Sequence, residues 1–411
     1  MSSTTTLPSQ ELMEREHAVV FQTYRRINVA IDRAEGMRIY DVDGKAYLDM
    51  LGGIAVNALG HSHPRIIEAV EHQIRRYMHV SNVFYQEPQV TLAEQLVKAS
   101  GYPRVFFSNS GAESTDGAMK MARRYGSATG RYDIIGFSGG FHGRTFGALS
   151  IMDKPLYKDG MGPFLPNTLV LPFNDIDALE SRVDEHTAAV MIEFLQGEGG
   201  IAEATQEFVD AIWRLKEQYG FLVIADEVQS GVARTGRWFA THYEEGFEPD
   251  MFTIAKGIAG GMPISAVTGR AEIMDSSHAG GIGGTYGGNP VAAAAAVAVL
   301  KQIEAGGVLE RALEIETILT TRLNELKDKH PVIAEVRGRG AMIAIEFVEP
   351  GTLNPNSAAS DKVVKFCHMN GVIVLNAGTF GNVIRFLPPL AITDAQLHEA
   401  LDVLAEGLAT I

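Results

Sequence analysis

The chain has 411 residues, of which 46% are apolar and 21% are charged, the balance of an ordinary globular protein. Its net charge is −15 and no cluster of Lys and Arg stands out, which argues against a nucleic-acid or anionic-membrane partner because both require a basic surface. Cys367 is the only cysteine, so an internal disulfide is excluded and a reducing cytoplasm is the expected location.

The N-terminal segment carries no recognisable targeting signal. Residues 1–20 lack a basic stretch followed by an apolar run, so we expect no signal peptide. Residues 37–56 have the pattern of a hairpin whose turn is Asp43-Gly44. We expect residues 1–59 to form a segment that packs with a smaller C-terminal domain.

The middle of the chain alternates short apolar runs with helical patterns. Runs typical of buried strands occupy residues 104–108, 133–137, 188–194, 221–226 and 264–269. Amphipathic stretches such as residues 208–220 separate them. This α/β alternation indicates a large, mostly parallel sheet covered on both faces, and ligands of such sheets collect at the carboxyl ends of the strands. We expect this large domain to span residues 60–295.

The last part of the chain predicts a smaller α+β domain over residues 296–411. Just before it, the apolar run at 291–300 is too short to span a bilayer and predicts a buried helix with Pro290 in its first turn. A long helical stretch at 308–328 follows, and then strand-like residues at 335–347 and a final helix. Because the longest strongly apolar run, at 291–300, is too short to cross a bilayer, we expect no membrane-spanning segment.

Two residues at strand ends suggest chemistry. Asp226 stands at the end of the buried strand at 221–226, where it is either a reactive acid or a cap of the next loop. Lys256 lies in a mostly apolar stretch with glycines just behind it. A desolvated lysine has a lowered pKa and becomes a nucleophile toward carbonyls, which is the chemistry of Schiff-base formation.

Two loops have the composition of phosphate sites. Residues 104–126 predict a strand, a turn of small residues and a helix, so the backbone N–H groups of Ser110, Gly111 and Ala112 are expected to be free at the helix start. Residues 283–290 combine glycines with the hydroxyl of Thr285. Each loop alone is weak evidence, and no dinucleotide or Walker motif accompanies them.

Together these features fit one cofactor, pyridoxal phosphate. That cofactor needs a lysine, an acid facing its pyridine nitrogen and a cradle for its phosphate. The acid and the lysine are 30 residues apart (256 − 226), the length of one crossover between strands.

Residues from about 37 to 390 resemble the class III aminotransferases, which are fold-type-I pyridoxal phosphate enzymes. The motifs that carry the resemblance follow the order of that family: GGIAVNALGHSHP (52–64), SNSGAES (108–114), FHGRT (141–145), LQGEGG (195–200), ADEVQSG (225–231), AKGIAGGMP (255–263), GGTYGGNP (283–290) and VIRFLPPL (383–390).

The resemblance implies roles around the cofactor. Asp226 would pair with the pyridine nitrogen, and Lys256 would hold the cofactor and then move a proton. Glu193 would be a second acid near the substrate carbon, although Phe194 stands where the family usually has proline. Val228 and Phe141 would pack on the two faces of the cofactor ring, and Gln229 would donate a hydrogen bond to its phenolic oxygen. The cofactor phosphate would be held by Ser110, Gly111, Ala112 and Thr285. Of these four, Thr285 would reach across from the neighbouring subunit of a homodimer.

The resemblance also implies the residues that bind substrate. An arginine binds a carboxylate as a bidentate fork. Arg385 would bind the α-carboxylate of glutamate or 2-oxoglutarate, and Glu198 would pair with it when an ω-amine enters. Arg144 would take the far carboxylate, and Ile54 would contact the substrate. His61 and His63 lie two residues apart with no third ligand, so we expect no metal site.

These residues predict an aminotransferase that moves the terminal amino group of an ω-amino acid to 2-oxoglutarate, giving a semialdehyde and glutamate. The donor stays open. The later motifs favour 4-aminobutyrate, whereas the first third and Phe141 are more typical of acetylornithine or ornithine enzymes. A pyridoxal phosphate aminomutase or epimerase would keep Lys256 and Asp226 but would not consume 2-oxoglutarate. A non-enzymatic binding protein on this fold is the remaining, disfavoured alternative.

Overall fold

The computed structural model describes residues 9–411, and its largest sheet has seven strands. In spatial order they are β4 (Arg104–Ser108), β12 (Ser265–Gly269), β11 (Met251–Ile254), β10 (Leu222–Asp226), β7 (Thr187–Ile192), β5 (Asp133–Phe137) and β6 (Thr168–Leu171). The strands from β11 to β6 are parallel, whereas β12 runs antiparallel to both of its neighbours. The expectation of a large, mostly parallel sheet is confirmed.

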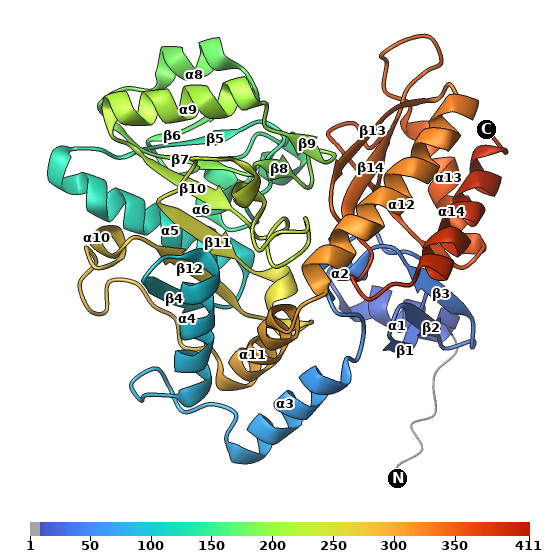
Figure 1. Ribbon diagram of the computed structural model, residues 1–411, viewed down its shortest axis with the longest axis horizontal. Coiled ribbons are helices and arrows are strands. Elements are labelled where there is room, and N and C mark those ends of the chain that lie inside the picture. Colours follow the sequence, from blue (N-terminus) through green and yellow to red (C-terminus); the bar gives the residue numbers. More distant parts are fainter. Residues whose placement is uncertain (1–8) are drawn as a thin grey trace.

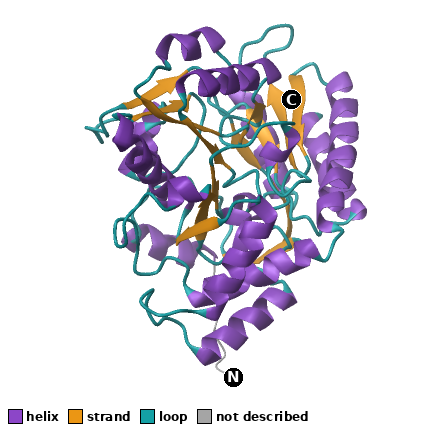
Figure 2. Cartoon of the chain, turned by 60° about the vertical axis from the view of Figure 1, so that its left-hand side comes forward, coloured by secondary structure: helices purple, strands orange, loops and turns teal. Residues whose placement is uncertain are grey.

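Helices cover both faces of this sheet because alternate strand residues are apolar on both sides. Along β10, Val223 belongs to the same buried cluster as Ile212 of α9 (Gln206–Tyr219). The next residue, Ile224, belongs to the cluster that contains Met119 of α5 (Gly111–Gly126). Figures 1 and 2 show the helices on the two sides of the strands.

A second group of helices supports the turn that follows β11. Helix α11 (Pro290–Glu304) packs against α3 (Pro64–Arg76), α4 (Glu87–Ser100) and the short helix η3 (Lys256–Ala259). As expected, Pro290 lies in the first turn of a mostly buried helix. The side chain of Asn289 caps this helix by accepting a hydrogen bond from the N–H of Val291 at 2.9 Å.

The C-terminal part of the chain forms a smaller antiparallel sheet with its own helices, at the right of Figure 1. The strands are β13 (Ile333–Arg339), β14 (Met342–Phe347), β17 (Val383–Phe386) and β16 (Leu375–Ala377), in that order. The helices are α12 (Val308–Lys329), α13 (Ser357–Met369) and α14 (Asp394–Leu408). This is the expected combination of a large sheet with a smaller α+β unit.

The N-terminal strands join this C-terminal part. Strands β1 (Ile31–Glu35), β2 (Arg38–Asp41) and β3 (Ala46–Asp49) form an antiparallel meander, and β3 pairs in parallel with β15 (Val372–Ile373). The hairpin between β2 and β3 contains Asp43-Gly44, as expected, but its connection spans residues 42–45. The domain boundaries at residues 59 and 295 stay predictions.

The remaining elements are short or peripheral. They are α1 (Ser9–Val19), α2 (Gly52–Ala55), α6 (Phe146–Ser150), α7 (Pro155–Lys158), α8 (Ile176–Arg182), α10 (Ala271–Met274), η1 (Ser127–Thr129), η2 (Ala240–Tyr243), β8 (Leu195–Gln196) and β9 (Ala202–Glu203). Within residues 9–411 no single helix is long and apolar enough to cross a membrane; α11 and α12 meet that test only as a pair, which bends by 72°. The expectation about a signal peptide falls partly on residues 1–8, outside the described residues.

The loop after β10 is docked on the turn between β13 and β14. The N–H of Ala341 donates to the carbonyl of Arg234 at 2.9 Å. At Gly340 the backbone has a φ of +59°, and a Cβ there would lie 2.4 Å from the carbonyl carbon of Thr235. Only glycine therefore allows the two segments to approach this closely.

We expect Gly340→Ala to lower the free energy of unfolding by about 2–5 kcal/mol, because the left-handed φ and the backbone clash both cost energy. Gly351→Ala is the matched control, since Gly351 has a φ of +79° but nothing within 4 Å of its added Cβ. Thermal denaturation followed by circular dichroism compares the two. Equal shifts in both variants would show that the contact with Thr235 is not tight.

Candidate active site

A cavity of about 300 Å³ opens beside the carboxyl ends of β10 and β11. Seven of the residues singled out in the sequence line it together: Ser110, Gly111, Ala112, Phe141, Asp226, Val228 and Lys256. It is completed by residues that sequence reasoning did not select: Val56, Asn109, His142, Gly143, Ala255, Gly261, Met262, Pro263 and Ile264. The elements that supply these residues are far apart in the sequence but end at one edge of the sheet, as ligand sites of parallel sheets do.

Asp226 ends β10 and is buried, so its carboxylate needs partners from the protein. One oxygen, Oδ1, accepts hydrogen bonds from the N–H of Val228 and from the hydroxyl of Thr253, both at 3.0 Å. The other oxygen, Oδ2, lies 2.7 Å from Nδ1 of His142. Thr253 is in place because it pairs with Asp226 in the register of β10 and β11. Three donors thus hold this carboxylate in a fixed position.

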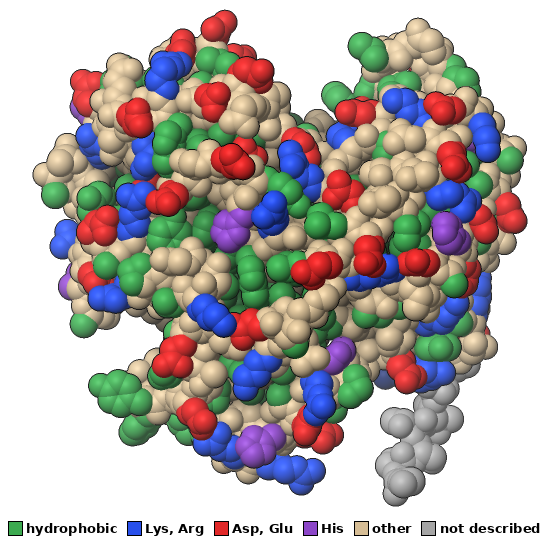
Figure 3. All heavy atoms as spheres, in the orientation of Figure 1, with side chains coloured by type: hydrophobic (Ala, Val, Ile, Leu, Met, Phe, Trp, Pro, Cys, Tyr) green, Lys and Arg blue, Asp and Glu red, His purple; other side chains and the backbone are tan. Residues whose placement is uncertain are grey.

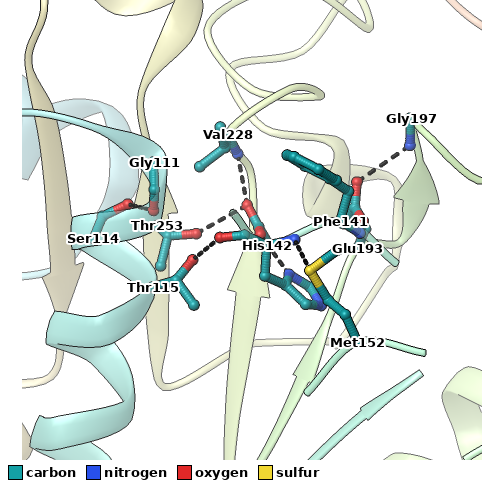
Figure 4. A network of polar contacts seen from close by, with 11 residues as sticks. Gly111, Ser114, Thr115, Phe141, His142, Met152, Glu193, Gly197, Val228 and Thr253 are labelled. Carbon is teal, nitrogen blue, oxygen red and sulfur yellow. Dashed lines mark hydrogen bonds and ion pairs between the residues drawn. The ribbon is translucent and has the colours of Figure 1, made fainter. Parts of the chain in front are cut away.

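His142 is a partner that the sequence analysis treated only as a neighbour of Phe141. Figure 4 shows its backbone held by Thr115 and Met152, while its ring turns toward the acid at the end of β10. Burial disfavours a charged imidazole, but the hydrogen bond and charge of Asp226 outweigh burial and raise the pKa of His142. The buried imidazole therefore has its charge balanced by the carboxylate beside it.

Glu193 lies behind Phe141 and is not one of the residues that line the cavity within the described chain. Its carboxylate accepts hydrogen bonds from the N–H of Phe141 at 2.7 Å and from the N–H of Gly197 at 3.2 Å. Burial, with the nearby charge of Asp226, raises the pKa of Glu193 to about 7. Phe194, the residue that replaces the family's proline, is buried and packs edge-on against Phe247.

Lys256 begins the turn after β11, two residues beyond the last strand residue. Its backbone has a φ of +45°, a conformation that is rare for a side chain with a Cβ and that is frequent at functional sites. Burial lowers the pKa of its amine, although the charges of Glu198 and Glu193 act in the opposite direction. A lysine whose pKa is lowered has more of the neutral, nucleophilic amine at neutral pH.

The start of α5 offers two free backbone donors, not three. The N–H groups of Gly111 and Ala112 form no hydrogen bond to any residue between 9 and 411. The expectation that Ser110 N–H is also free is wrong, because it donates to the carboxylate of Glu113 at 3.1 Å, while the Ser110 hydroxyl accepts from the N–H of Glu113. Ser-x-x-Glu at 110–113 is a capping-box pattern, so the sequence did contain this signal.

Gln229 lies next to the cavity with an unused hydrogen-bonding group. Its side chain is buried, and within the described residues its oxygen Oε1 has no hydrogen-bond partner. A Cβ at residue 197 would lie 2.3 Å from this Oε1, so any larger residue in place of Gly197 would displace the amide of Gln229. A buried polar atom without a partner is costly and indicates a missing ligand atom.

Glu198 and Arg385 form an ion pair although they come from separate parts of the fold. Arg385 is a buried residue of β17, and its Nη1 donates to Oε1 of Glu198 at 2.5 Å. Burial alone would raise the pKa of Glu198, but the charge and hydrogen bond of Arg385 lower it. The charge of Lys256 also lowers the pKa of Glu198, which indicates that the pair is close to the lysine in the cavity. Neither residue of the pair lines the cavity in the described structure.

Three other predicted residues lie outside the cavity of their own chain. Arg144 is exposed at the rim, where its guanidinium covers the ring of Tyr157. Ile54 is half-buried with a φ of +62° and packs against the apolar cluster of Leu195 and Leu387. Thr285 is exposed in the loop before α11. The structure of one chain therefore does not bring Thr285 to the site.

Comparison with known proteins places this arrangement in a family. Residues 20–408 match the family model of class III aminotransferases. The acetylornithine aminotransferase of Archaeoglobus fulgidus is 41% identical over 393 residues, which cover 95% of this chain and 99% of the relative. The 4-aminobutyrate aminotransferase of Mycobacterium tuberculosis is 42% identical over 436 residues, which cover 98% of this chain and 96% of the relative.

Solved structures agree with these relatives. The ornithine aminotransferase of Toxoplasma gondii, a structure with pyridoxal phosphate partly occupying its active site, superposes with a TM-score of 0.92 at 31% identity. The match covers 98% of this chain and 95% of that one. The chain therefore belongs to the class III aminotransferases, enzymes that depend on pyridoxal phosphate and transfer an amino group from a donor to a 2-oxo acid.

Proposed function

We propose that this aminotransferase moves the terminal amino group of an ω-amino acid, with 4-aminobutyrate favoured, to 2-oxoglutarate. The products are a semialdehyde and glutamate. The observation that carries the proposal is the ion pair of Glu198 and Arg385 beside the cavity. An arginine that is paired in one half of the reaction and free in the other suits an enzyme that binds two unlike substrates in turn.

The residues around the cavity fit pyridoxal phosphate. The N–H groups of Gly111 and Ala112 are free to hold its phosphate at the start of α5. Asp226 is the acid for the pyridine nitrogen, and the amide NH2 group of the buried Gln229 would donate a hydrogen bond to the phenolic oxygen. When bound, the cofactor supplies a conjugated ring that accepts the electron pair left when the substrate C–H bond breaks.

Lys256 provides the covalent attachment and then carries the proton. Its Nζ is a neutral amine more often than that of an exposed lysine, because burial lowers its pKa. Once substrate has displaced it, this Nζ takes the proton from the substrate carbon and later delivers one. Asp226 is held in place by three donors to its carboxylate and would pair with the pyridine nitrogen of the bound cofactor.

The ion pair of Glu198 and Arg385 determines whether the cavity binds a substrate with or without an α-carboxylate. With the pair closed, the buried guanidinium is neutralised and a substrate end without an α-carboxylate fits beside it. Glutamate and 2-oxoglutarate bring an α-carboxylate that replaces Glu198 as the partner of Arg385. The far carboxylate of either substrate goes to Arg144 at the rim. The pair therefore lets one cavity accept both substrates.

An acetylornithine or ornithine donor is the second candidate. Its support is that relatives of equal similarity carry different names, acetylornithine aminotransferase at 41% identity and 4-aminobutyrate aminotransferase at 42%. These donors also present a terminal amine, so the same pair and the same arginine at the rim would serve them. The length and polarity of the far end distinguish the donors.

We also propose that the active unit is a homodimer in which Thr285 reaches the partner's cofactor phosphate. The loop between α3 and α4 carries exposed apolar side chains, including Val83, Phe84 and Tyr85. Figure 3 shows hydrophobic side chains at the lower left, where Figure 1 draws the loop between α3 and α4. Asn82 ties the loop to the Thr285 segment by donating to the carbonyl of Gly287 at 2.9 Å. An exposed apolar surface beside the exposed Thr285 loop supports the proposal that a second copy of the chain covers this surface.

We also propose a division into residues 1–59, 60–295 and 296–411, and a cytoplasmic location. The first rests on the change from the large sheet to the smaller one. The second rests on Cys367 being the only cysteine of the sequence.

We expect Glu198→Gln to raise the preference for glutamate over 4-aminobutyrate about ten-fold or more, because a lost charged hydrogen bond is worth about 1.5–3 kcal/mol. Arg385→Ala should slow the half-reactions of glutamate and 2-oxoglutarate about thirty-fold or more, while the ω-amine half-reaction changes less. Single-turnover absorbance of the bound cofactor separates the half-reactions, and a panel of donors with 2-oxoglutarate identifies the best one by glutamate release.

Glu203→Gln is the matched control for this pair, because it removes a carboxylate that contacts Arg339 away from the cavity. It should leave the preference unchanged. Equal losses in both half-reactions for Glu198→Gln and Arg385→Ala would mean that the pair is only structural. Absence of glutamate release with every donor would contradict the proposed function itself.

We expect Thr285→Ala to weaken cofactor binding about ten-fold, because a hydrogen bond to a charged phosphate is lost. A heterodimer of one Thr285→Ala subunit and one Lys256→Ala subunit tests whether Thr285 acts across the interface. If it does, one of the two sites combines the intact Lys256 of the first subunit with the intact Thr285 of the second. Fluorescence titration with cofactor should then recover a fraction of tight sites. If every site stays weak, Thr285 does not act across the interface.

A further inference from the structure

Tyr157 lies on the short helix α7 at the rim of the cavity and holds the side chain of Arg144. The guanidinium carbon of Arg144 is 3.4 Å from the centroid of the Tyr157 ring. At this distance the planar cation lies on the aromatic face, which attracts it electrostatically. Neither the motifs nor the spacing of the sequence pointed to Tyr157.

This aromatic contact is connected to the cavity. The Tyr157 ring meets the ring of Phe141, which lines the cavity, edge-on at 5.9 Å with an angle of 85°. Arg144 lies 5.5 Å from the same Phe141 ring, so the three side chains form one group at the rim. Lys154 also lies over Tyr157 at 5.2 Å, and its charge contributes to lowering the pKa of Glu198.

The contact leaves the hydrogen-bonding edge of Arg144 free. Among residues 9–411 this arginine has neither a salt bridge nor a side-chain hydrogen bond. Its face is occupied by Tyr157, whereas its N–H groups point along the plane and stay available to a carboxylate fork. An exposed arginine normally samples many rotamers, and binding a ligand must order it. Holding the guanidinium on an aromatic ring reduces that cost in advance.

We propose that Tyr157 is a positioning residue for Arg144 and thereby sets the preference for amino donors that carry a carboxylate at the end far from the transferred amine. The inference rests on the proposed function, in which Arg144 takes that carboxylate. It assigns to the α7 segment a role in substrate choice, through the aromatic ring and not through the tyrosine hydroxyl, which has no hydrogen-bond partner in the described part of the chain.

The test compares 4-aminobutyrate with n-butylamine, a donor of the same length without the carboxylate. Tyr157→Leu should raise KM for 4-aminobutyrate about five- to ten-fold with kcat nearly unchanged, and should leave kcat/KM for n-butylamine as it is. The dissociation constant of butyrate, which has the carboxylate without the amine, should rise by the same factor. Tyr157→Phe keeps the ring and should restore the values of the native enzyme.

Phe164→Leu is the matched control. Phe164 lies in the same segment and holds a different cation, Lys158, at 4.7 Å. This variant reproduces any general loosening of the segment without touching the contact of Arg144, and it should leave KM for 4-aminobutyrate unchanged. Circular dichroism and cofactor absorbance establish that each variant folds and binds pyridoxal phosphate.

Combining Tyr157→Leu with Arg144→Ala distinguishes the ways in which the proposal fails. The proposal predicts that Tyr157→Leu has less than about a two-fold further effect once Arg144 is absent. If Arg144→Ala raises KM for 4-aminobutyrate but Tyr157→Leu does not, the positioning role is wrong and the proposed function stands. If Arg144→Ala leaves the ratio of 4-aminobutyrate to n-butylamine unchanged, the far-carboxylate assignment is wrong and the inference falls with it.

Discussion

The buried carboxylate of Asp226 is the constraint on which the cavity depends. A carboxylate without water must be surrounded by donors, and here they come from three separate segments: the N–H of Val228, the hydroxyl of Thr253 and the ring of His142. Meeting this requirement fixes the loop after β10, the end of β11 and the loop that carries Phe141. Because β10 and β11 are parallel neighbours, the same arrangement brings Lys256 to the same cavity.

The charges around Asp226 balance in pairs, which explains how so many ionisable groups are buried together. His142 neutralises Asp226, and Arg385 neutralises Glu198. Glu193 has two backbone donors for its carboxylate, and burial raises its pKa to about 7, so it is less often charged at neutral pH than an exposed glutamate. Lys256 is left without a dedicated counter-ion among the described residues, and burial lowers the pKa of its amine. The group without a fixed partner is thus the one that must react.

Much of the fold was predictable because strand positions follow from local apolar runs. The runs at 104–108 and 133–137 coincide with β4 and β5, and the run at 308–328 coincides with α12 within one residue. Contacts between distant segments were not predictable. His142 and Asp226 are 84 residues apart, and nothing near either one indicates the other. The contact of Tyr157 with Arg144 was likewise not indicated by the residues near either one. The capping role of Glu113, in contrast, was visible in the sequence as a Ser-x-x-Glu pattern.

The central claim is that the amine of Lys256, which lines the same cavity as Asp226, is the group that attaches pyridoxal phosphate. Reduction of the cofactor-loaded protein with borohydride makes this attachment permanent, and peptide mapping by mass spectrometry then locates it. The account predicts one pyridoxyl group per chain, on the peptide that contains Lys256, and no covalent label in Lys256→Ala. A label on Lys154, Lys158 or any other lysine of the native protein would contradict the account.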